Sequence, residues 1–204
     1  TANFASPSVK VDPSTRSLET AVQDWLVYMG VAESVQTIDK GKLGHELKVT
    51  TSATDAPQDL THVGVGVSQV LPILVMCLLA NPDTTLIIEQ PELHLHPKVQ
   101  TLLADFFLSM AMLGKQCIIE THSEYIINRL RFRAAAAQDE SISSLMKMYF
   151  VQKKEGTSVF DPVIVNKYGA ITDWPEGFFD QSQREAEEIL RAGLNKKKQE
   201  RGNR

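Results

Sequence analysis

Two short apolar segments, each followed by an acidic residue, constrain the fold of this chain more than any other feature. Residues 85–88 (TLII) lead into Glu89, and residues 117–119 (CII) lead into Glu120. Both segments are short, apolar and partly β-branched, which is typical of strands covered on both faces of a parallel sheet. Between them lies one helical stripe, stopped by Gly114, made of Val99, Leu102, Leu103, Phe106, Phe107 and Met110. Strand, helix and strand over about 35 residues predict a βαβ unit, and hence an α/β fold.

Helices and one further strand are predicted on either side of this unit. Apolar residues at helical spacing predict a helix over residues 18–29, with Ser17 placed to cap it and Gly30 to end it. Residues 46–51 alternate as a strand does, and residues 52–61 are polar and predict a loop. An apolar helix is expected after Gly64, Gly66 and Ser68, as far as about residue 80, before a turn at 81–83. A second helix is expected over 123–136, followed by a loop over 138–144.

The last quarter of the chain changes character. Residues 147–151 and 159–165 flank the sequence KKEGTS and predict a β-hairpin that turns near Gly156. Residues 173–179 (DWPEGFF) predict a turn with three aromatic residues, Trp174, Phe178 and Phe179. A last helix is expected from Gln183 to about residue 192. It leads into a tail that holds five basic residues and one acid from position 196 onward, which predicts disorder.

Charge and cysteine content exclude several classes of protein. With 21 basic and 25 acidic residues among 204, the formal charge is −4, which excludes a globally basic nucleic-acid binder. Cys77 and Cys117 lie in apolar runs and are expected to be buried thiols of a reducing compartment, so we expect a cytoplasmic protein. The longest apolar run, 70–80, contains Pro72 and is shorter than the roughly 20 residues of a membrane span. The N-terminus has no signal-peptide pattern, and the absence of an initiating Met suggests a piece of a longer chain.

The acidic residue and the histidine that follow the two strands are candidates for chemistry. Glu89 is expected at the carboxyl edge of the sheet, where ligands bind in open α/β sheets and a carboxylate can orient water around Mg²⁺. His122 follows the second strand and is expected at the same edge, where an imidazole can hydrogen-bond a γ-phosphate. Taken singly, each pattern also fits a structural role: a strand ending in a solvated loop, and a loop histidine that caps the next helix with Ser123.

A third segment, residues 63–69 (VGVGVSQ), directly precedes an apolar helix. Small residues let the backbone approach a ligand, and a helix N-terminus offers unpaired N–H groups to an anion. A flexible entry to a buried helix explains a Gly-x-Gly equally well.

Together these segments resemble the ABC/SMC-type ATPase heads of bacterial AAA-like ATPases found in phage-defence and overcoming-lysogenization-defect-like systems. Residues 64–69 resemble the signature motif of that family, residues 87–92 its Walker B strand, 93–97 its D-loop region and 120–123 its switch-histidine segment. The resemblance covers about residues 62–131, in the order and spacing of the family. Residues 147–190 resemble a C-terminal module of uncharacterised function attached to some of these ATPases, whereas the first 60 residues match loosely.

The resemblance implies a nucleotide-driven homodimer. Two heads pair head to tail around ATP and Mg²⁺, and the signature loop of one head contacts the γ-phosphate held by the P-loop of the other. Glu89 would then be the acid near Mg²⁺ and His122 the γ-phosphate switch. Ser68 would act in trans with the backbone of Gly64 and Gly66, and the nucleotide-binding set also includes Gln69 and His96. The expected organisation is an N-terminal part of the head (1–61), the core with these motifs (62–137), the C-terminal module (145–192) and the basic tail (193–204).

Two departures from the family bear on catalysis. A P-loop has the pattern G-x-x-x-x-G-K-[ST], which the sequence lacks, so we expect an N-terminal lobe or a separate chain to supply the phosphate cradle. Gln90 occupies the usual position of the catalytic glutamate, and loss of a general base typically costs about 10²–10⁴ in rate. Glu92, two residues further on, is the candidate replacement. The predicted enzyme is therefore an ATPase whose catalytic set is Gln90, Glu92 and His122, with turnover left open.

Other functions remain open from the sequence alone. The runner-up is an ATP-sensing scaffold with little hydrolysis that holds a nuclease or another effector. A third reading takes Glu92, His94 and His96 as zinc ligands of a metal-dependent hydrolase, because two imidazoles at i, i+2 can chelate the metal. The aromatic residues near position 178 can dock a partner or a nucleic-acid base, or pack a turn onto its own domain, and the basic tail can contact DNA or stay solvated.

Overall fold

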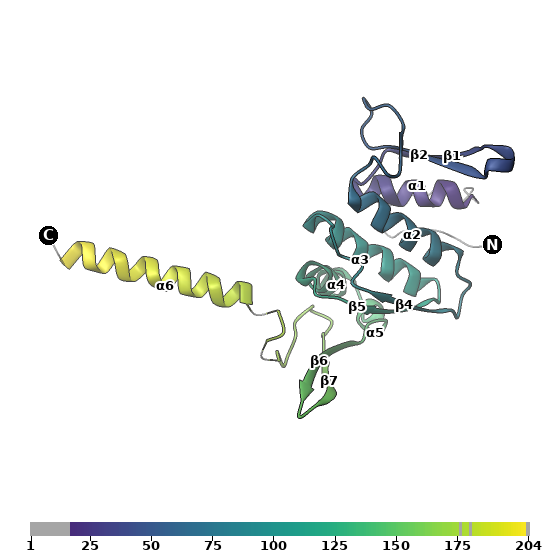
Figure 1. Ribbon diagram of the computed structural model, residues 1–204. Helices are drawn as coiled ribbons and strands as arrows, with labels where there is room; N and C mark the ends of the chain where they lie inside the picture. Colours follow the sequence, from purple (N-terminus) through teal and green to yellow (C-terminus); the bar gives the residue numbers. More distant parts are fainter. Residues whose placement is uncertain (1–16, 176, 180, 203–204) are drawn as a thin grey trace.

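The computed structural model describes residues 17–175, 177–179 and 181–202 (Figure 1). The helices and strands along the chain are α1 (Leu18–Met29), β1 (Ser34–Asp39), η1 (Gly41–Leu43), β2 (His45–Thr50), β3 (Gln58–Asp59), α2 (Val65–Leu79), β4 (Thr85–Glu89), α3 (Pro97–Met112), β5 (Gln116–Glu120), α4 (Glu124–Ala136), α5 (Ser141–Ser144), β6 (Met148–Lys154), β7 (Thr157–Val163) and α6 (Gln181–Gly202). The mixed α/β fold predicted from the sequence is confirmed.

The βαβ unit forms as predicted. Strands β4 and β5 are parallel, in a register that pairs Thr85 with Gln116 and Glu89 with Glu120. Helix α3 connects them, and its buried residues include the apolar stripe residues Leu103, Phe106, Phe107 and Met110. Gly114 follows the helix with φ +77°, in the left-handed region that favours glycine, so the chain can reverse into β5.

The expectation that both faces of these strands are covered is wrong for the described residues. Leu86 and Ile88 are each 7% exposed and face the helices, whereas Ile87 is 71% exposed and its register partner Ile118 is 50% exposed. The sheet holds two strands, and one of its faces is open. Apolar composition predicted burial on both faces, but the second covering layer is not supplied by the described part of the chain.

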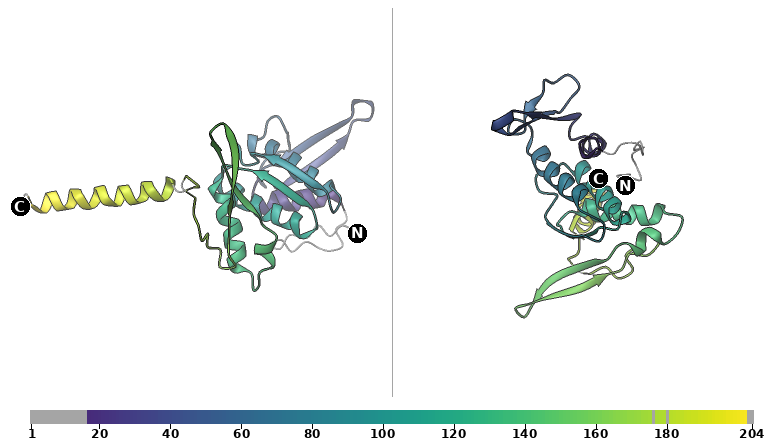
Figure 2. Two further views of the ribbon diagram at one scale, coloured as in Figure 1. Left: turned by 90° about the horizontal axis from the view of Figure 1, so that it is seen from below. Right: turned by 90° about the vertical axis from the view of Figure 1, so that its right-hand side faces the viewer.

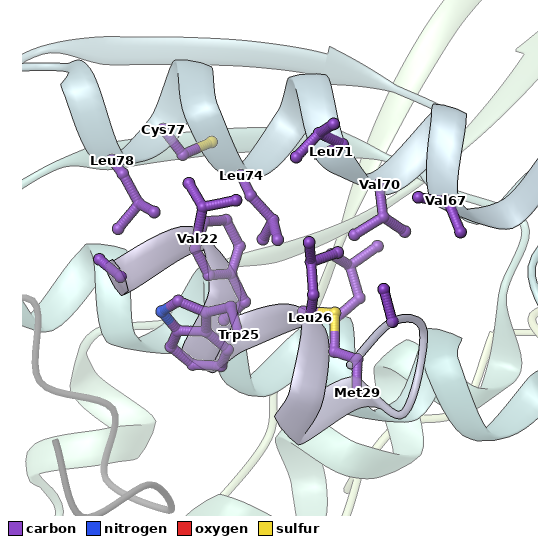
Figure 3. Close-up of a cluster of buried hydrophobic side chains, with 14 of the residues drawn as sticks. Val22, Trp25, Leu26, Met29, Val67, Val70, Leu71, Leu74, Cys77 and Leu78 are labelled. Carbon is purple, nitrogen blue, oxygen red and sulfur yellow. The ribbon is translucent and has the colours of Figure 1, made fainter. Parts of the chain in front are cut away.

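Helices α1, α2 and α3 contribute most of the main core. Figure 3 shows the side chains of α1 and α2 that face one another within it. The Trp25 ring of α1 packs edge-on against Phe106 of α3 with ring centroids 4.9 Å apart. Gly30 ends α1 in the left-handed conformation predicted for it, and its N–H donates to the carbonyls of Leu26 and Val27. Ser17 occupies the N-cap position, but its side chain makes no capping hydrogen bond, so that part of the prediction is wrong.

Helix α2 begins earlier than predicted. Gly64 is its N-cap, so Gly66 and Ser68 lie in the first turn rather than in a preceding loop. The C-terminus of α2 is closed by a buried lysine: Lys115 Nζ donates to the carbonyls of Cys77 (2.8 Å) and Leu78 (3.2 Å). A buried ammonium that meets two carbonyls at a helix C-terminus satisfies orphan acceptors and complements the helix dipole. Burial also lowers the pKa of Lys115 below its usual value.

A small antiparallel sheet, β1-β2-β3, was only partly predicted. Strand β2 matches the predicted strand to within a residue, but β1 was missed, and β3 lies within the predicted loop 52–61. Most side chains of β1 are exposed, so it lacks the alternation that identifies a half-buried strand. One ion pair joins β2 to β3, with Lys48 Nζ 2.9 Å from Asp59, and the same ammonium lies 2.8 Å from Glu46 of its own strand.

Strands β6 and β7 form the predicted hairpin, paired from Met148↔Val163 to Lys154↔Thr157. Its two-residue turn places Glu155 and Gly156 at φ +51° and +84°, the positive values that a tight hairpin turn needs. Phe178 is buried in this module, where its ring packs edge-on against Phe150, Trp174 and Phe179. These aromatic residues therefore pack a turn onto their own module. The short helix α5 occupies part of the predicted loop 138–144.

Helix α6 extends beyond the predicted end. It continues through Gly202, so the prediction of a disordered tail is wrong for residues 193–202, and residues 203–204 lie outside the described part. Its sequence is rich in Glu, Lys, Arg and Gln, which favour helix, and has no proline. The helix projects away from the rest of the molecule (Figures 1 and 2). No helix among the described residues has both the length and the apolar character of a membrane span.

Candidate nucleotide site

Two carboxylates lie side by side at the carboxyl edge of the parallel strands. Glu89 ends β4, Glu120 ends β5, and the two residues are register partners. The Gln90 N–H donates to the Glu120 carbonyl at 2.9 Å, which continues the ladder by one residue. Both carboxylates are exposed, so a hydrated cation can reach them. The sequence predicted Glu89 for this edge but gave no role to Glu120.

His122 lies at the same edge with its ring accessible. Its side chain is 76% exposed, and Nε2 lies 3.2 Å from Glu120 Oε1. Its backbone N–H donates to Glu92 Oε1 at 2.6 Å. The backbone is thus held, while the ring beside Glu120 stays exposed to solvent.

Glu92 is the buried carboxylate of the site. The residue is 7% exposed, and with Oε1 bound to the His122 N–H, its Oε2 has no partner among the described residues. The loop around it is strained: Gln90 and His94 have φ values of +46° and +61°, which are uncommon for residues other than glycine. Strained backbone and an unsatisfied buried oxygen cluster at functional sites, because the surrounding structure must hold them in place.

A second hydrogen-bonded connection ties the same two loops together. Gln100 of α3 donates through Nε2 to the Leu95 carbonyl at 2.9 Å and accepts at Oε1 from Ser123 Oγ at 2.6 Å. Ser123 Oγ also accepts from the Ile126 N–H at 3.3 Å and so caps α4, which is the structural role that the sequence offered as an alternative for this segment. The loop after β4 and the His122 segment therefore form one polar unit. Sequence reasoning missed Gln100, because its two partners lie in different loops and no spacing pattern connects them.

The middle and the last turn of α4 are held against α3 and α1 by a buried charge cluster. Asp105 of α3 is 0% exposed and accepts hydrogen bonds from Arg129 and Arg133 of α4 and from Tyr28 of α1. Burial alone would raise the pKa of Asp105, but the hydrogen bonds from Arg133, Arg129 and Tyr28 outweigh it and hold that pKa below its usual value. The cluster thus anchors the helix that follows His122.

Both cysteine thiols lie in apolar surroundings, as the sequence predicted. Cys77 is fully buried and Cys117 partly buried, and neither forms a disulfide. Burial raises the pKa of Cys77 to about 12 and that of Cys117 to about 11, so both stay protonated at neutral pH.

The zinc site predicted as a third reading does not form. His96 is the N-cap of α3, and its Nδ1 accepts from the Lys98 N–H at 3.2 Å. Within residues 17–175, 177–179 and 181–202, no three His, Cys, Asp or Glu side chains are arranged to hold a metal ion. The prediction of a metal-dependent hydrolase at Glu92, His94 and His96 fails, because the three side chains do not converge.

The segment 64–69, predicted as a signature motif, lies beside the loop 93–97 rather than within the strand edge. A Cβ built on Gly66 would stand 3.6 Å from Leu95 Cδ2, so the first turn of α2 packs close to this buried leucine. Gly64 is exposed at the N-cap, and Gln69 is also exposed. Ser68 is half-buried, and its Oγ donates within its own helix to the Val65 carbonyl at 2.8 Å.

Comparisons with known proteins identify the family. A model described as "AAA ATPase domain" matches residues 9–127, and one described as "Protein of unknown function (DUF3696)" matches residues 143–189. A solved structure described as "Structural biochemistry of ATP-driven dimerization and DNA stimulated activation of SMC ATPases" is similar with a TM-score of 0.55 and 13% identity, covering 72% of this chain and 83% of that one. A structure of the SmcHead bound to the C-winged helix domain of ScpA also gives a TM-score of 0.55 and 13% identity, covering 74% of this chain and 43% of that one.

No curated protein gives a match. At 13% identity, the likeness to the two solved structures concerns the fold, and it confirms the predicted resemblance to ABC/SMC-type heads at that level. The ATPase-domain match spans more than half of the chain. The chain therefore belongs to the AAA ATPase domain family and has the fold of SMC ATPase heads.

Proposed function

We propose that this chain forms the part of an ABC-type ATPase head that carries the signature, Walker B, D-loop and switch-histidine segments, and that two heads pair head to tail around ATP and Mg²⁺. The observation that carries the proposal is the shared strand edge: Glu89, Glu120 and the exposed ring of His122 lie together where ligands bind in parallel sheets. The proposed division is an N-terminal part (1–61), this core (62–137), a C-terminal module (145–192) and the segment from 193 onward.

Each residue has a separate role in this proposal. Glu89 orients water around the Mg²⁺ that accompanies the nucleotide, and His122 hydrogen-bonds the γ-phosphate. The N-terminal turn of α2, with Gly64, Gly66, Ser68 and Gln69, meets the nucleotide held by the sister head, as does His96 of the D-loop. The exposure of Gly64 and Gln69 supports this assignment, because a segment that acts in trans must be accessible.

The open face of the sheet supports a second lobe that carries the P-loop. Parallel strands are found almost entirely with both faces covered, yet Ile87 and Ile118 are exposed on one face. We propose that the lobe with the phosphate cradle covers this face, whether it belongs to the same polypeptide or to a separate chain. Charged substitutions at both isoleucines are expected to block that association while this chain stays folded.

Gln90 favours a second candidate function, an ATP-sensing scaffold that hydrolyses slowly and holds a nuclease or another effector. An amide cannot take a proton from water at neutral pH. Glu92, the nearest carboxylate replacement in sequence, is buried and uses Oε1 to hold the His122 N–H, so only Oε2 is left for a base. Phosphate release separates the two functions. If the scaffold is correct, the wild-type protein hydrolyses ATP slowly and Gln90→Glu raises its turnover. If instead the wild-type protein is an active ATPase and Glu92→Ala alone abolishes that activity, the scaffold is overturned.

The cellular role is also proposed. The resemblance to AAA-like ATPases of phage defence suggests a cytoplasmic role in defence or in another DNA-related process. One structural neighbour comes from SMC ATPases described as activated by DNA, which supports testing DNA as an activator here. Addition of duplex DNA to the assembled ATPase is expected to raise phosphate release, and identical rates with and without DNA would argue against it.

Nucleotide-dependent pairing tests the main proposal. In a protein that includes the P-loop lobe, ATP and Mg²⁺ are expected to drive pairing of the heads, which fluorescence energy transfer between labelled heads can measure. His122→Ala and Ser68→Arg are expected to weaken this pairing, through loss of a γ-phosphate contact and through bulk at the trans surface. The matched controls are His45→Ala and Ser158→Arg, at exposed positions in β2 and β7 to which the proposal gives no role, and they are expected to pair normally. Normal ATP-dependent pairing by both His122→Ala and Ser68→Arg would contradict the proposal.

A further inference from the structure

Helix α6 is long and exposed along most of its length. It spans 22 residues, and every side chain from Arg184 to Lys197 is exposed. In Figures 1 and 2 it projects from the body as a single rod. Isolated helices are marginal in water, since most helical stability in proteins comes from packing of one face. A helix of this kind is therefore expected to pack against another molecule.

One face of α6 is apolar. Ile189, Leu190 and Leu194 are 70%, 68% and 53% exposed. At 100° per residue, Ala186 and Gly193 fall between them on the same face, so this face mixes two small residues with the three large ones. Small residues at an interface let two helix backbones approach closely. This α6 stripe has the pattern of a helix-pairing surface.

The N-terminal half of α6 (181–191) holds three acids and two arginines, whereas its C-terminal half (192–202) holds four bases and one acid. Glu185, Glu187 and Glu188 lie in the N-terminal half, and Lys196 and Lys197 in the C-terminal half. Glu185 and Lys196 are eleven residues apart, which places them on the same flank of the α6 stripe, within about 20° of each other. They are also separated by about 16 Å along the axis, which is too far for a pair within one helix. Opposite charges on one flank complement a second copy running the other way.

We propose that α6 pairs antiparallel with α6 of a second copy of this chain, without nucleotide. The two-fold axis passes between residues 190 and 191, so that Glu185 of each copy faces Lys196 of the other. Such a contact is isologous and closed, as a two-fold interface must be. It goes beyond the ATP-dependent pairing of heads: by holding two chains together, it raises the effective concentration at which their heads meet.

A lone helix and a different packing surface are the alternatives to this pairing, and experiment separates them from it. Acids near a helix N-terminus and bases near its C-terminus also stabilise a single helix through the macrodipole, without any partner. The outer face of the hairpin, with Tyr149, Val151 and Phe160 each more than half exposed, is a second apolar surface on which α6 of another copy could pack. Neither alternative requires Glu185 to face Lys196 of another copy.

Oligomeric state without nucleotide is the first test. Sedimentation equilibrium of this chain over a range of concentrations is expected to give a monomer–dimer equilibrium, and Leu190→Asp is expected to give monomer. Leu43→Asp is the matched control, because Leu43 is 91% exposed and outside α6, and it is expected to dimerise normally. A cooperative unfolding transition at the wild-type temperature confirms that the Leu190→Asp body is folded. A wild-type chain that remains monomeric overturns the proposal.

A charge exchange is the second and sharper test. Glu185→Lys and Lys196→Glu alone are each expected to weaken dimerisation by about tenfold, since like charges then face each other twice per dimer. The double variant is expected to restore it, because every pair is again opposite. If the double variant does not recover dimerisation, the antiparallel arrangement is overturned. Packing of α6 on the hairpin face of another copy would give this result, because it does not pair Glu185 with Lys196. Ser68→Arg and His122→Ala are expected to leave this nucleotide-free dimer intact, so the result is independent of the proposed ATP site.

Discussion

Asp105 shows how a single buried charge can hold the site together. Its carboxylate is 0% exposed and bound by Arg129, Arg133 and Tyr28, which come from two other helices. Asp105→Asn leaves the two guanidinium groups poorly compensated. Because these groups are partly exposed, we expect a loss near the lower end for a broken buried pair, about 3 kcal/mol of unfolding free energy. Urea denaturation measures it, and Asp173→Asn, at an exposed position, is the control.

The same cluster gives a pH dependence of defined sign. The pKa of Asp105 is lower in the folded chain than in the unfolded chain. Its contribution to stability is therefore fully present above its unfolded pKa and is lost as the pH falls through the folded value. The stability difference between wild type and Asp105→Asn is expected to shrink in that acidic range. A difference that stays constant as the pH falls from neutral through that range would show that the ionised form is not the stabilising one.

Glu92 has a testable role in the free protein, independent of nucleotide. Its Oε1 accepts the His122 N–H at 2.6 Å. Glu92→Ala removes this acceptor and is expected to accelerate amide hydrogen exchange at His122 by about fivefold, consistent with a net hydrogen-bond contribution of about 1 kcal/mol. Glu92→Gln retains an acceptor oxygen and is expected to lose less protection. Equal protection at His122 in wild type and Glu92→Ala would exclude the positioning role.

At the scale of elements, Gly169 joins the C-terminal module to α4. Its carbonyl accepts from Arg131 Nε at 2.8 Å, its φ is +72°, and an added Cβ would lie 2.4 Å from the Arg131 carbonyl oxygen. The Cβ of Gly169→Ala can therefore be accommodated only if the backbone at 169 and the backbone of α4 move apart. We expect a loss of at least about 2 kcal/mol of unfolding free energy. Gly156→Ala is the matched control: its φ is +84° with open space around it, so we expect a loss of about 1 kcal/mol. Thermal unfolding of both variants gives the comparison, and equal losses would contradict the close contact.

Elements with a strong local pattern were predicted from the sequence, whereas those that depend on a partner were not. The βαβ unit, α1 and the hairpin have apolar periodicity and well-placed glycines, so local physics specifies them. Strand β1 is mostly exposed and forms because it pairs with β2. Its local sequence does not indicate that pairing. At the site, the strand edge with Glu89 and His122 followed from parallel topology. Gln100 did not, because its two hydrogen bonds join segments 28 residues apart in the sequence, Leu95 and Ser123.

At the scale of the whole molecule, two surfaces remain to be covered. The open face of β4 and β5 requires a covering layer, for which we propose the lobe that carries the P-loop. The α6 stripe requires a helix, for which we propose a second copy. The two surfaces lie on different parts of the chain, so one protein can use both at once: α6 to stay paired and the heads to close on ATP.

Mixing two variants tests the central claim most directly. In the proposed sandwich, each nucleotide site takes His122 from one head and Ser68 from the other. In the protein with its P-loop lobe, Ser68→Arg and His122→Ala are each expected to weaken ATP-dependent head closure strongly, measured by fluorescence energy transfer between labelled heads. An equimolar mixture contains mixed dimers with one intact site, and is expected to recover closure in about half of the dimers, the share of mixed pairs expected for random association. A mixture that closes no better than either variant alone would contradict a site shared between two heads.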